Sequence, residues 1–184
     1  PAGDADNRKE VEARIFAEPF KNSPGFFQGL GLGVAASHGQ KLGITNQVPS
    51  YITTGQNTFF AYAGTTTSVG EQTRIQPQAY FYHNALGVIA EYTTSSLELA
   101  SSAAGPTRKQ DNTAWQVATT YLLTGEDASF NQPVRPSSPY KIGGEGWGAF
   151  EVGLRAGDIT IDEDAFTAPA LAAGAAAATN NFAP

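Results

Sequence analysis

The chain has 184 residues and a formal net charge of -6; hydrophobic residues make up 41% of it and charged residues 15%. This length allows one domain with a hydrophobic core, whereas the charged fraction lies below the roughly 25% of typical soluble domains. The negative balance without a basic stripe argues against a general nucleic-acid binder, and the lack of cysteine excludes a disulfide framework and a thiolate metal site.

The first third of the chain contains two patterns that predict β-strands. After a polar segment at residues 1–10, apolar side chains alternate with polar ones over 11–17 and predict a strand. Between 25 and 36, leucine and valine alternate with glycine, so one face of a strand is bulky and the other nearly bare. We expect a loop over 37–50, and a third strand within 51–63, centred on 58–63.

The clearest pattern is a hairpin over residues 71–99, with its turn at Asn84-Ala85. Ile75, Ala79 and Phe81 share one face of the first arm, because successive side chains of a strand point to opposite sides. Arginine, glutamine and tyrosine side chains occupy the other face. The hairpin therefore has one apolar and one polar face.

The second half of the chain predicts two further strands, at 115–123 and at about 146–157. A long loop rich in proline, serine and glycine separates them at 125–145, with a possible extra strand near 134–142. An alanine-rich, low-complexity tail follows at 163–184 and fits either a helix or disorder. We therefore expect three parts: a polar segment at 1–10, strands and loops at 11–162, and this tail.

The fold predicted is all-β and antiparallel, with about seven strands, most of them about 10–13 residues long. A tilted strand needs about 9–11 residues to cross a membrane, whereas soluble strands average about 5–6. Apolar runs are too short for a transmembrane helix, and the first residues lack the pattern of a signal peptide. The pattern also leaves open a soluble sandwich or a lipocalin-like barrel.

The sequence contains only weak motifs for metal binding, catalysis or nucleotide binding. His38 and His83 lie on different elements, which argues against a metal site. The adjacent acids at 126–127 point apart on an extended chain, which favours an ordered loop over catalysis. Gly31, Gly33 and Ala36 fit the spacing of a nucleotide-binding glycine motif, but no acid follows about 20 residues later. We expect these glycines to be either small positions that face a lumen or places where another segment packs closely. We also expect no enzyme activity and no cofactor.

Six strings of residues occur in order between 11 and 162: VEARIFAEPF, FFQGLGLGVAA, TTGQNTFFAYA, RIQPQAYFYHNALGVIAEY, NTAWQVATTYLLTGEDASF and GGEGWGAFEVGLRAGDITID. Together they make the chain resemble the phosphate-selective porin O and P family of Gram-negative outer membranes. The most distinctive pieces are LTGED at 123–127 and GWGAFE at 146–151. The resemblance implies an antiparallel transmembrane β-barrel, usually of sixteen strands and trimeric, of which this chain would form about half.

If this resemblance holds, the protein is an outer-membrane porin for passive diffusion of small hydrophilic solutes or ions, including inorganic anions such as phosphate. Its partners would be outer-membrane lipid and two further copies in a homotrimer, with no nucleic acid. Acids at 12, 91 and 151 offset three arginines on the expected pore face, which favours a weakly selective pore. The other possibilities are a non-conducting envelope or surface-layer component and a soluble β-sandwich that binds carbohydrate. The expected pore-lining residues are Arg14, Arg74, Gln76, Gln78, Glu91, Gln116, Glu151 and Arg155.

Overall fold

The computed structural model describes residues 8–45, 48–53, 55–102, 105–167 and 171. Over this part of the chain the fold is all-β, with two short 3-10 helices, η1 (Phe26–Gly29) and η2 (Glu163–Ala165), and no α-helix. No helix in these ranges is both long and apolar enough to cross a membrane. The prediction of an all-β, antiparallel protein is therefore confirmed.

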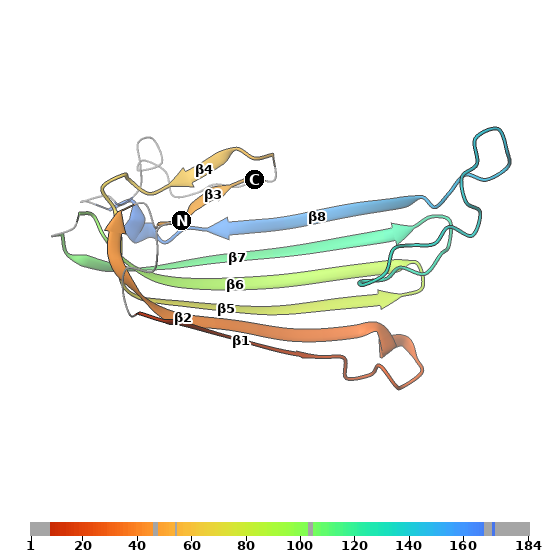
Figure 1. Ribbon diagram of the computed structural model, residues 1–184, viewed down its shortest axis with the longest axis horizontal. Coiled ribbons are helices and arrows are strands. Elements are labelled where there is room, and N and C mark those ends of the chain that lie inside the picture. Colours follow the sequence, from red (N-terminus) through yellow and green to blue (C-terminus); the bar gives the residue numbers. More distant parts are fainter. Residues whose placement is uncertain (1–7, 46–47, 54, 103–104, 168–170, 172–184) are drawn as a thin grey trace.

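Six long strands form one antiparallel sheet in the order β1-β2-β5-β6-β7-β8 (Figure 1). They are β1 (Glu10–Ala17), β2 (Leu30–Thr45), β5 (Thr67–His83), β6 (Leu86–Ala100), β7 (Thr107–Leu122) and β8 (Glu151–Thr160). Within the described ranges β1 pairs only with β2, and β8 only with β7. The sheet is therefore open at both edges, and no closed barrel is found in this part of the chain.

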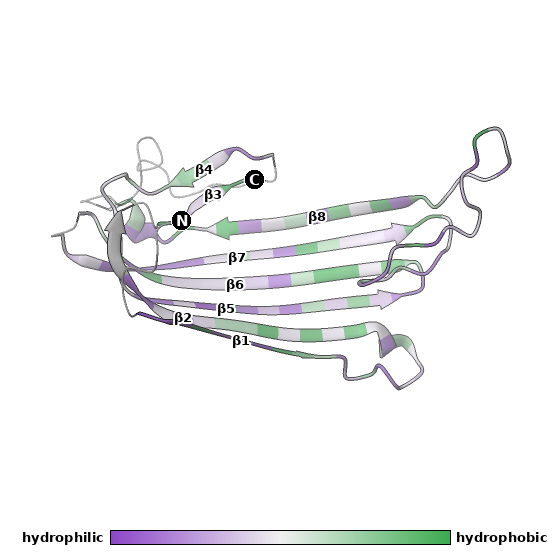
Figure 2. Ribbon diagram, viewed as in Figure 1, coloured by the Kyte–Doolittle hydropathy of each residue, from purple (hydrophilic) through white to green (hydrophobic). Residues whose placement is uncertain are grey.

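One face of the sheet, here called the apolar face, carries most of the aliphatic side chains. Antiparallel register places Ile15 opposite Val34 and Val34 opposite Pro77, and directly paired residues point to the same side. Figure 2 shows that the hydrophobic positions of β2 gather in the part of the strand nearest the 84–85 turn. The apolar face comprises Val11, Ala13, Ile15, Leu32, Val34, Ile75, Pro77, Ala79, Phe81, Val88, Ala90, Tyr92, Trp115, Val117, Thr119, Tyr121, Val152, Leu154 and Ala156.

The opposite side, the polar face, carries charged, amide, hydroxyl and glycine positions. The pairs Glu12–Ser37 and Ser37–Arg74 form one row across β1, β2 and β5. Gln78, Glu91 and Gln116 form another row across β5, β6 and β7. The hydrophobic alternation therefore separates the two faces over all six strands.

A small hairpin covers the polar face at the end away from the 84–85 turn. It consists of β3 (Ser50–Ile52) and β4 (Thr58–Ala61), which pair with each other outside the main sheet (Figure 1). The buried Phe60 and Tyr62 form a hydrophobic cluster with Leu97 and Leu99 of β6. The core of the described chain therefore lies under this hairpin rather than between two sheets.

Polar groups fix the position of the hairpin. The Asn112 amide of β7 donates hydrogen bonds to the hydroxyls of Tyr51, at 2.9 Å, and Tyr62, at 3.1 Å. The backbone N–H of Asp162 donates to the Asn112 carbonyl oxygen at 2.9 Å. Burial raises the pKa of Tyr62 well above its usual range, so the hydroxyl stays protonated. The buried Asn112 is therefore satisfied at both ends of its amide, as buried polar groups require.

The hairpin over 71–99 and its turn are confirmed, because β5 and β6 flank Asn84, which has φ of 49°.

Three expectations about the other elements were wrong. Residues 37–45 continue β2 instead of forming a loop, because they pair with β5 as far as Thr67. The strand expected within 51–63 is the separate β3–β4 hairpin, and the last strand starts at Glu151, not near 146.

The two ends of the chain fall largely outside the described residues. Of the expected polar segment at 1–10, residues 1–7 lie outside them. The same is true of 168–170 and 172–184 in the expected alanine-rich tail. No strand forms between 123 and 150, so the possible strand near 134–142 is not found.

Candidate functional site

All eight residues expected to line a pore lie on the polar face. Gln116 and Arg155 illustrate this, since they share the face through the pairs Gln116–Gly157 and Ala118–Arg155. The register does not bring the eight residues into one cluster. It distributes them over a pocket at β1 and β5, a row of two amides and one carboxylate across the middle strands, and two charges on β8.

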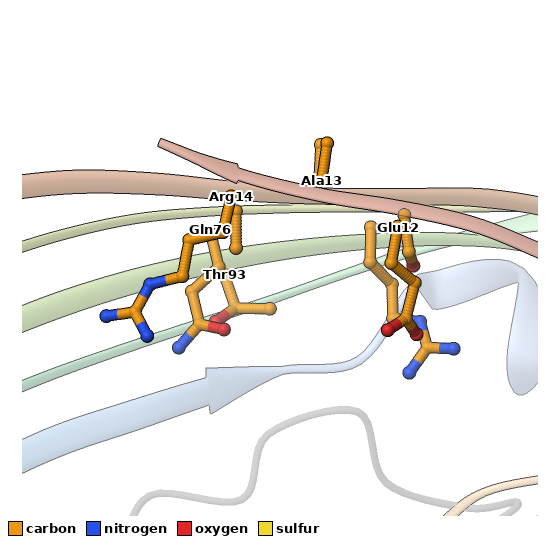
Figure 3. Close-up of a pocket in the computed structure, with 9 residues that line it drawn as sticks. Glu12, Ala13, Arg14, Gln76 and Thr93 are labelled. Atoms are coloured by element: carbon orange, nitrogen blue, oxygen red, sulfur yellow. The ribbon is translucent and has the colours of Figure 1, made fainter. Parts of the chain in front are cut away.

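A pocket of about 430 Å³ opens on the polar face, lined by residues of β1, β2, β5 and β6. Figure 3 shows Glu12, Arg14, Gln76 and Thr93 pointing to one side of the sheet, with Ala13 on the opposite side. The lining residues are Glu12, Ala13, Arg14, Ala35, Ala36, Ser37, Arg74, Gln76 and Thr93. Three of the predicted residues, at 14, 74 and 76, therefore meet in one cavity.

Glu10 organises the charges at one end of this pocket. Its carboxylate accepts from Arg74 Nη2 at 2.8 Å and from Lys41 Nζ at 3.3 Å. These pairs join β1, β2 and β5 across the polar face. Sequence reasoning missed Glu10 and Lys41, because Lys41 lies in the part of β2 that the pattern assigned to a loop.

Amide groups hold the charges in the middle of the face. With the Gln78 amide oriented to satisfy both groups, its oxygen accepts from Arg14 Nη2 at 2.6 Å and Nε at 2.9 Å. The Arg14 guanidinium also lies 5.7 Å from the centre of the Phe16 ring, within the range of a cation–π contact. Gln116 Nε2 donates to the Glu91 carboxylate across β6 and β7. These side chains therefore hold one another in place.

The two predicted residues on β8 are less constrained. Arg155 and Glu151 are exposed and lie four residues apart on the polar face, near the sheet edge. Neither forms a hydrogen bond or ion pair with the residues that the structure describes. Both charges therefore remain fully available to solvent or to a solute.

Aromatic rings on the polar face form a feature that the sequence analysis did not identify. Phe16 of β1 stacks on Tyr80 of β5, with ring centroids 5.6 Å apart. Phe130, in the long loop between β7 and β8, stacks on the same tyrosine at 4.6 Å. A Cβ added at Gly31 would lie 2.4 Å from the Tyr80 ring. This confirms the expectation that a glycine of β2 marks a close approach.

The long loop is ordered by backbone and carboxylate contacts. Ala128 N donates to the carbonyl of Asn84 at 2.7 Å, which ties the loop to the β5–β6 turn. The Glu126 carboxylate accepts from the Thr124 hydroxyl, and from Ser137 N at 3.0 Å and Ser137 Oγ at 2.9 Å. Hydrogen bonds that the Thr124 hydroxyl and the Ser137 backbone N–H donate to the carboxylate lower the pKa of Glu126 to about 2. The structure thus gives Glu126 the loop-ordering role expected for the 126–127 pair.

The other motifs considered in the sequence form no recognisable site. His38 Nδ1 lies 2.9 Å from the hydroxyl of Thr73, whereas the His83 ring packs against Phe26 and Phe81. Within the described ranges no three histidine, aspartate or glutamate side chains come together to hold a metal ion. Gly31, Gly33 and Ala36 all lie inside β2 and do not join a strand to a helix, as a nucleotide-binding motif requires.

Part of the long loop, drawn in teal, turns back toward the ends of β5 and β6 before it leaves the sheet (Figure 1). The contact between Phe130 and Tyr80 places this part on the polar face. The pocket, the aromatic rings and the loop therefore all lie on one side of the sheet. Comparison of the chain with protein-family models, curated proteins and solved structures finds no match, so the porin family resemblance stays a prediction.

Proposed function

We propose that this chain is part of a transmembrane β-barrel porin in the outer membrane of a Gram-negative bacterium. Its polar face would line a water-filled pore for passive diffusion of small hydrophilic solutes or ions, including anions such as phosphate. No chemical step is involved. The observation that carries this proposal is the exposure of the apolar face across all six strands of the sheet.

The exposed fractions on this face are high for aliphatic side chains. Leu154 is 79% exposed, Ile15 73% and Val11 69%. Soluble monomers rarely expose a continuous apolar patch larger than a few hundred Å². A sheet with one exposed apolar face and one polar face fits the wall of a membrane barrel, where the apolar side meets lipid and the other meets water.

The dimensions of the apolar face also fit a bilayer. Apolar side chains extend from Trp115 of β7 to Leu123, the residue directly after the strand, which corresponds to about 27 Å along the chain at the usual rise of about 3.4 Å per residue and to roughly 20 Å of height at the usual tilt of membrane strands. Membrane barrels have an apolar band about 25 Å tall, flanked by aromatic rings at both interfaces. Tyr92 and Trp115 lie near one end of the face, and Phe81 and Tyr121 near the other.

The open edges support a larger barrel. Strand directions alternate through the six-stranded sheet, so β1 and β8 run antiparallel to each other. An even number of further strands could therefore close the sheet with antiparallel pairing throughout. Membrane barrels avoid unpaired edges by such closure. The family resemblance supplies the number of sixteen strands and the homotrimer, and both are part of this proposal.

The loop between β7 and β8 gives the pore a constriction. Phe130 brings the loop onto the polar face. The hydrogen bonds that Glu126 accepts from Thr124 and Ser137 order the loop before and after Phe130. The β3–β4 hairpin covers the polar face near its other end. Both segments would narrow the pore, and the charges between them would set its selectivity.

A pair of neighbouring threonines on β7 tests the proposal. Thr119 lies on the apolar face opposite Leu154, and Thr120 lies on the polar face opposite Gly153. We expect T119R to impair insertion, because a cation near the bilayer midplane costs roughly 2–4 kcal/mol. T120R should insert normally and increase the preference for anions. The measurements are the fraction of full protein inserted into lipid vesicles and the ion selectivity in planar bilayers.

Three results would contradict the proposal. Equal insertion of T119R and T120R would mean that the apolar face does not meet lipid. Solubility without detergent would favour the soluble binding module. Insertion without any conductance would favour the structural envelope component.

A further inference from the structure

The apolar side of the sheet has a sharp edge at its end away from the 84–85 turn. On each of the six strands, the side chains on this side change there from polar to apolar within one step of two residues. The polar members of these steps are Lys9, His38, Thr73, Thr94, Thr113 and Asp158. The apolar members, here called the apolar edge, are Val11, Ala36, Ile75, Tyr92, Trp115 and Ala156.

The antiparallel register shows that the apolar edge crosses the sheet obliquely. Val11 lies on the edge, but its partner His38 lies outside it. On the far side of the sheet, Ala156 lies in the row that runs through Val117, Ala90, Ala79 and Leu32 to Ala17. Ala17 stands six positions after Val11 on β1. The edge therefore shifts by six residues along the strands between β1 and β8.

This shift gives the angle between the strands and the apolar edge. Six residues correspond to about 20 Å along a strand, and the five steps from β1 to β8 correspond to about 24 Å across the sheet. The edge therefore crosses the hydrogen-bonded rows at about 40°. Strands of membrane barrels are inclined by about 35–45° to the membrane normal, so an edge parallel to a membrane surface requires the inclination that such strands have.

The side chains at the edge fit a boundary between lipid and water. Tyr92 and Trp115 pair directly with each other on the edge and are 43% and 44% exposed. Tyrosine and tryptophan are enriched at membrane–water interfaces. The first residues beyond the edge include the charged Lys9 on β1 and Asp158 on β8. Aromatic and charged groups therefore follow the oblique edge from one side of the sheet to the other.

We propose that the strands cross the membrane inclined by about 40° to its normal, with lipid acyl chains covering the apolar side from this edge toward the 84–85 turn. With upright strands, lipid at Val11 would also cover Asp111, which lies in the same row through His38, Thr73 and Ser96. A charged side chain in hydrocarbon is costly. This inference rests on the proposed function, because it gives the orientation and depth of the face that the porin would place in lipid.

Four alanines of one row distinguish inclined from upright strands. They are Ala17, Ala79, Ala90 and Ala156. Upright strands would place all four at the same depth. At an inclination of 40°, the 24 Å between the ends of the row corresponds to about 15 Å in depth. Ala17 and Ala156 then lie toward opposite membrane surfaces, and Ala79 and Ala90 lie at the centre of the bilayer.

The test places a nitroxide label at each alanine in turn. The chain contains no cysteine, so A17C, A79C, A90C and A156C each provide one labelling site in the full protein, reconstituted into phosphatidylcholine vesicles. Electron paramagnetic resonance measures collisions of the label with oxygen, which concentrates in the bilayer, and with a water-soluble nickel chelate. We expect the labels of A79C and A90C to lie about 6 Å deeper than those of A17C and A156C.

A118C is the matched control, because Ala118 follows Val117 on β7 and lies on the polar face opposite Arg155. Its label should collide freely with the nickel chelate. Equal depth of all four row labels, or a deepest label at Ala17 or Ala156, would overturn the inclination and leave the porin function intact. Row labels as accessible to the chelate as the A118C label would instead contradict contact with lipid, and with it the porin function.

Discussion

The ring of Phe130 lies parallel to the ring of Tyr80, with centroids 4.6 Å apart and planes inclined by 16°. Tyr80 belongs to β5 in the middle of the sheet, and Phe130 to the loop that follows β7. Tyr80 also stacks on Phe16, and the two rings together form the aromatic surface on which the loop packs. The position of the loop over the polar face therefore depends on a small number of rings.

Phe130→Ala should release the loop from the polar face. Aromatic pairs contribute about 0.5–1.5 kcal/mol beyond their area, so we expect the sheet to remain folded while the constriction of the proposed pore opens. Single-channel conductance of the reconstituted protein should rise. Trp147→Ala is the control, since Trp147 lies in the same loop and is 80% exposed. Equal conductance in both variants and the parent protein would mean that the loop does not narrow the pore.

Gly31→Ala should disturb the contact between Phe16 and Tyr80, because the new methyl group on β2 would press on both rings. The added Cβ would lie 2.4 Å from the Tyr80 ring and 2.8 Å from the Phe16 ring. Such overpacking costs typically about 1–3 kcal/mol, and Tyr80 would have to move. Gly153→Ala is the matched control, because its new Cβ would meet nothing closer than 3.6 Å. Equal denaturant midpoints for the two variants would show that Tyr80 moves without cost.

The loop should lose its order in acid. The pKa of Glu126 is lowered from 4.5 to about 2 by hydrogen bonds from Thr124 and Ser137. A carboxyl group with a depressed pKa stabilises the loop fully above its unfolded pKa, and this stabilisation decreases as pH falls from 4.5 toward 2. Amide hydrogen exchange at Ser137, corrected for intrinsic rates, should therefore show constant protection between pH 5 and 8 and less protection at pH 3.

Glu126→Gln tests whether this carboxylate is responsible. The variant should lower the protection of Ser137 at neutral pH and remove its dependence on pH below 4.5. Glu145→Gln, in the same exposed loop, should behave like the parent protein. A pH dependence that persists in the Glu126 variant would assign it to another group.

Reversing the charge at two arginines should have unequal effects. Arg155 has no ionic partner among the described residues, so Arg155→Glu should shift the reversal potential toward cations and leave stability nearly unchanged. Arg74 is paired with Glu10 at 2.8 Å, so Arg74→Glu would place like charges together and lower stability as well. Lys109→Glu is the control, since its side chain lies on the other side of the sheet, paired with Asp111 at 3.2 Å. Unchanged selectivity in both arginine variants would remove them from the pore.

Much of the sheet could be predicted from the sequence because alternation is strict where one face is apolar. Apolar side chains recur every two residues from Ile75 to Phe81 and from Trp115 to Tyr121, and both segments lie in long strands. The second half of β2 was missed because 37–41 are polar on both faces. These residues are extended because β5 is long enough to pair with them, which is a tertiary effect that local pattern does not contain.

The candidate site was predictable in part. Alternation placed Arg14, Arg74 and Gln76 on one face, but their meeting in a pocket depends on the register between β1, β2 and β5. The contact of Phe130 with Tyr80 could not be predicted from alternation. Phe130 lies in a loop rich in proline and serine, where side chains do not alternate between two faces as they do in a strand. The β3–β4 hairpin was misread for a related reason. Its aromatic residues form a buried cluster beside the sheet, and they resemble a barrel strand in sequence.

The unequal lengths of the connections suggest an order of folding. The turn at 84–85 joins β5 to β6, and β7 begins seven residues after β6 ends, at Thr107 after Ala100. Contacts between segments close in sequence form fastest, since little loop entropy is lost. We therefore expect β5, β6 and β7 to associate first. β2 and β8 join through longer connections and would add later, so the two outer parts of the sheet should be the first to exchange their amide hydrogens.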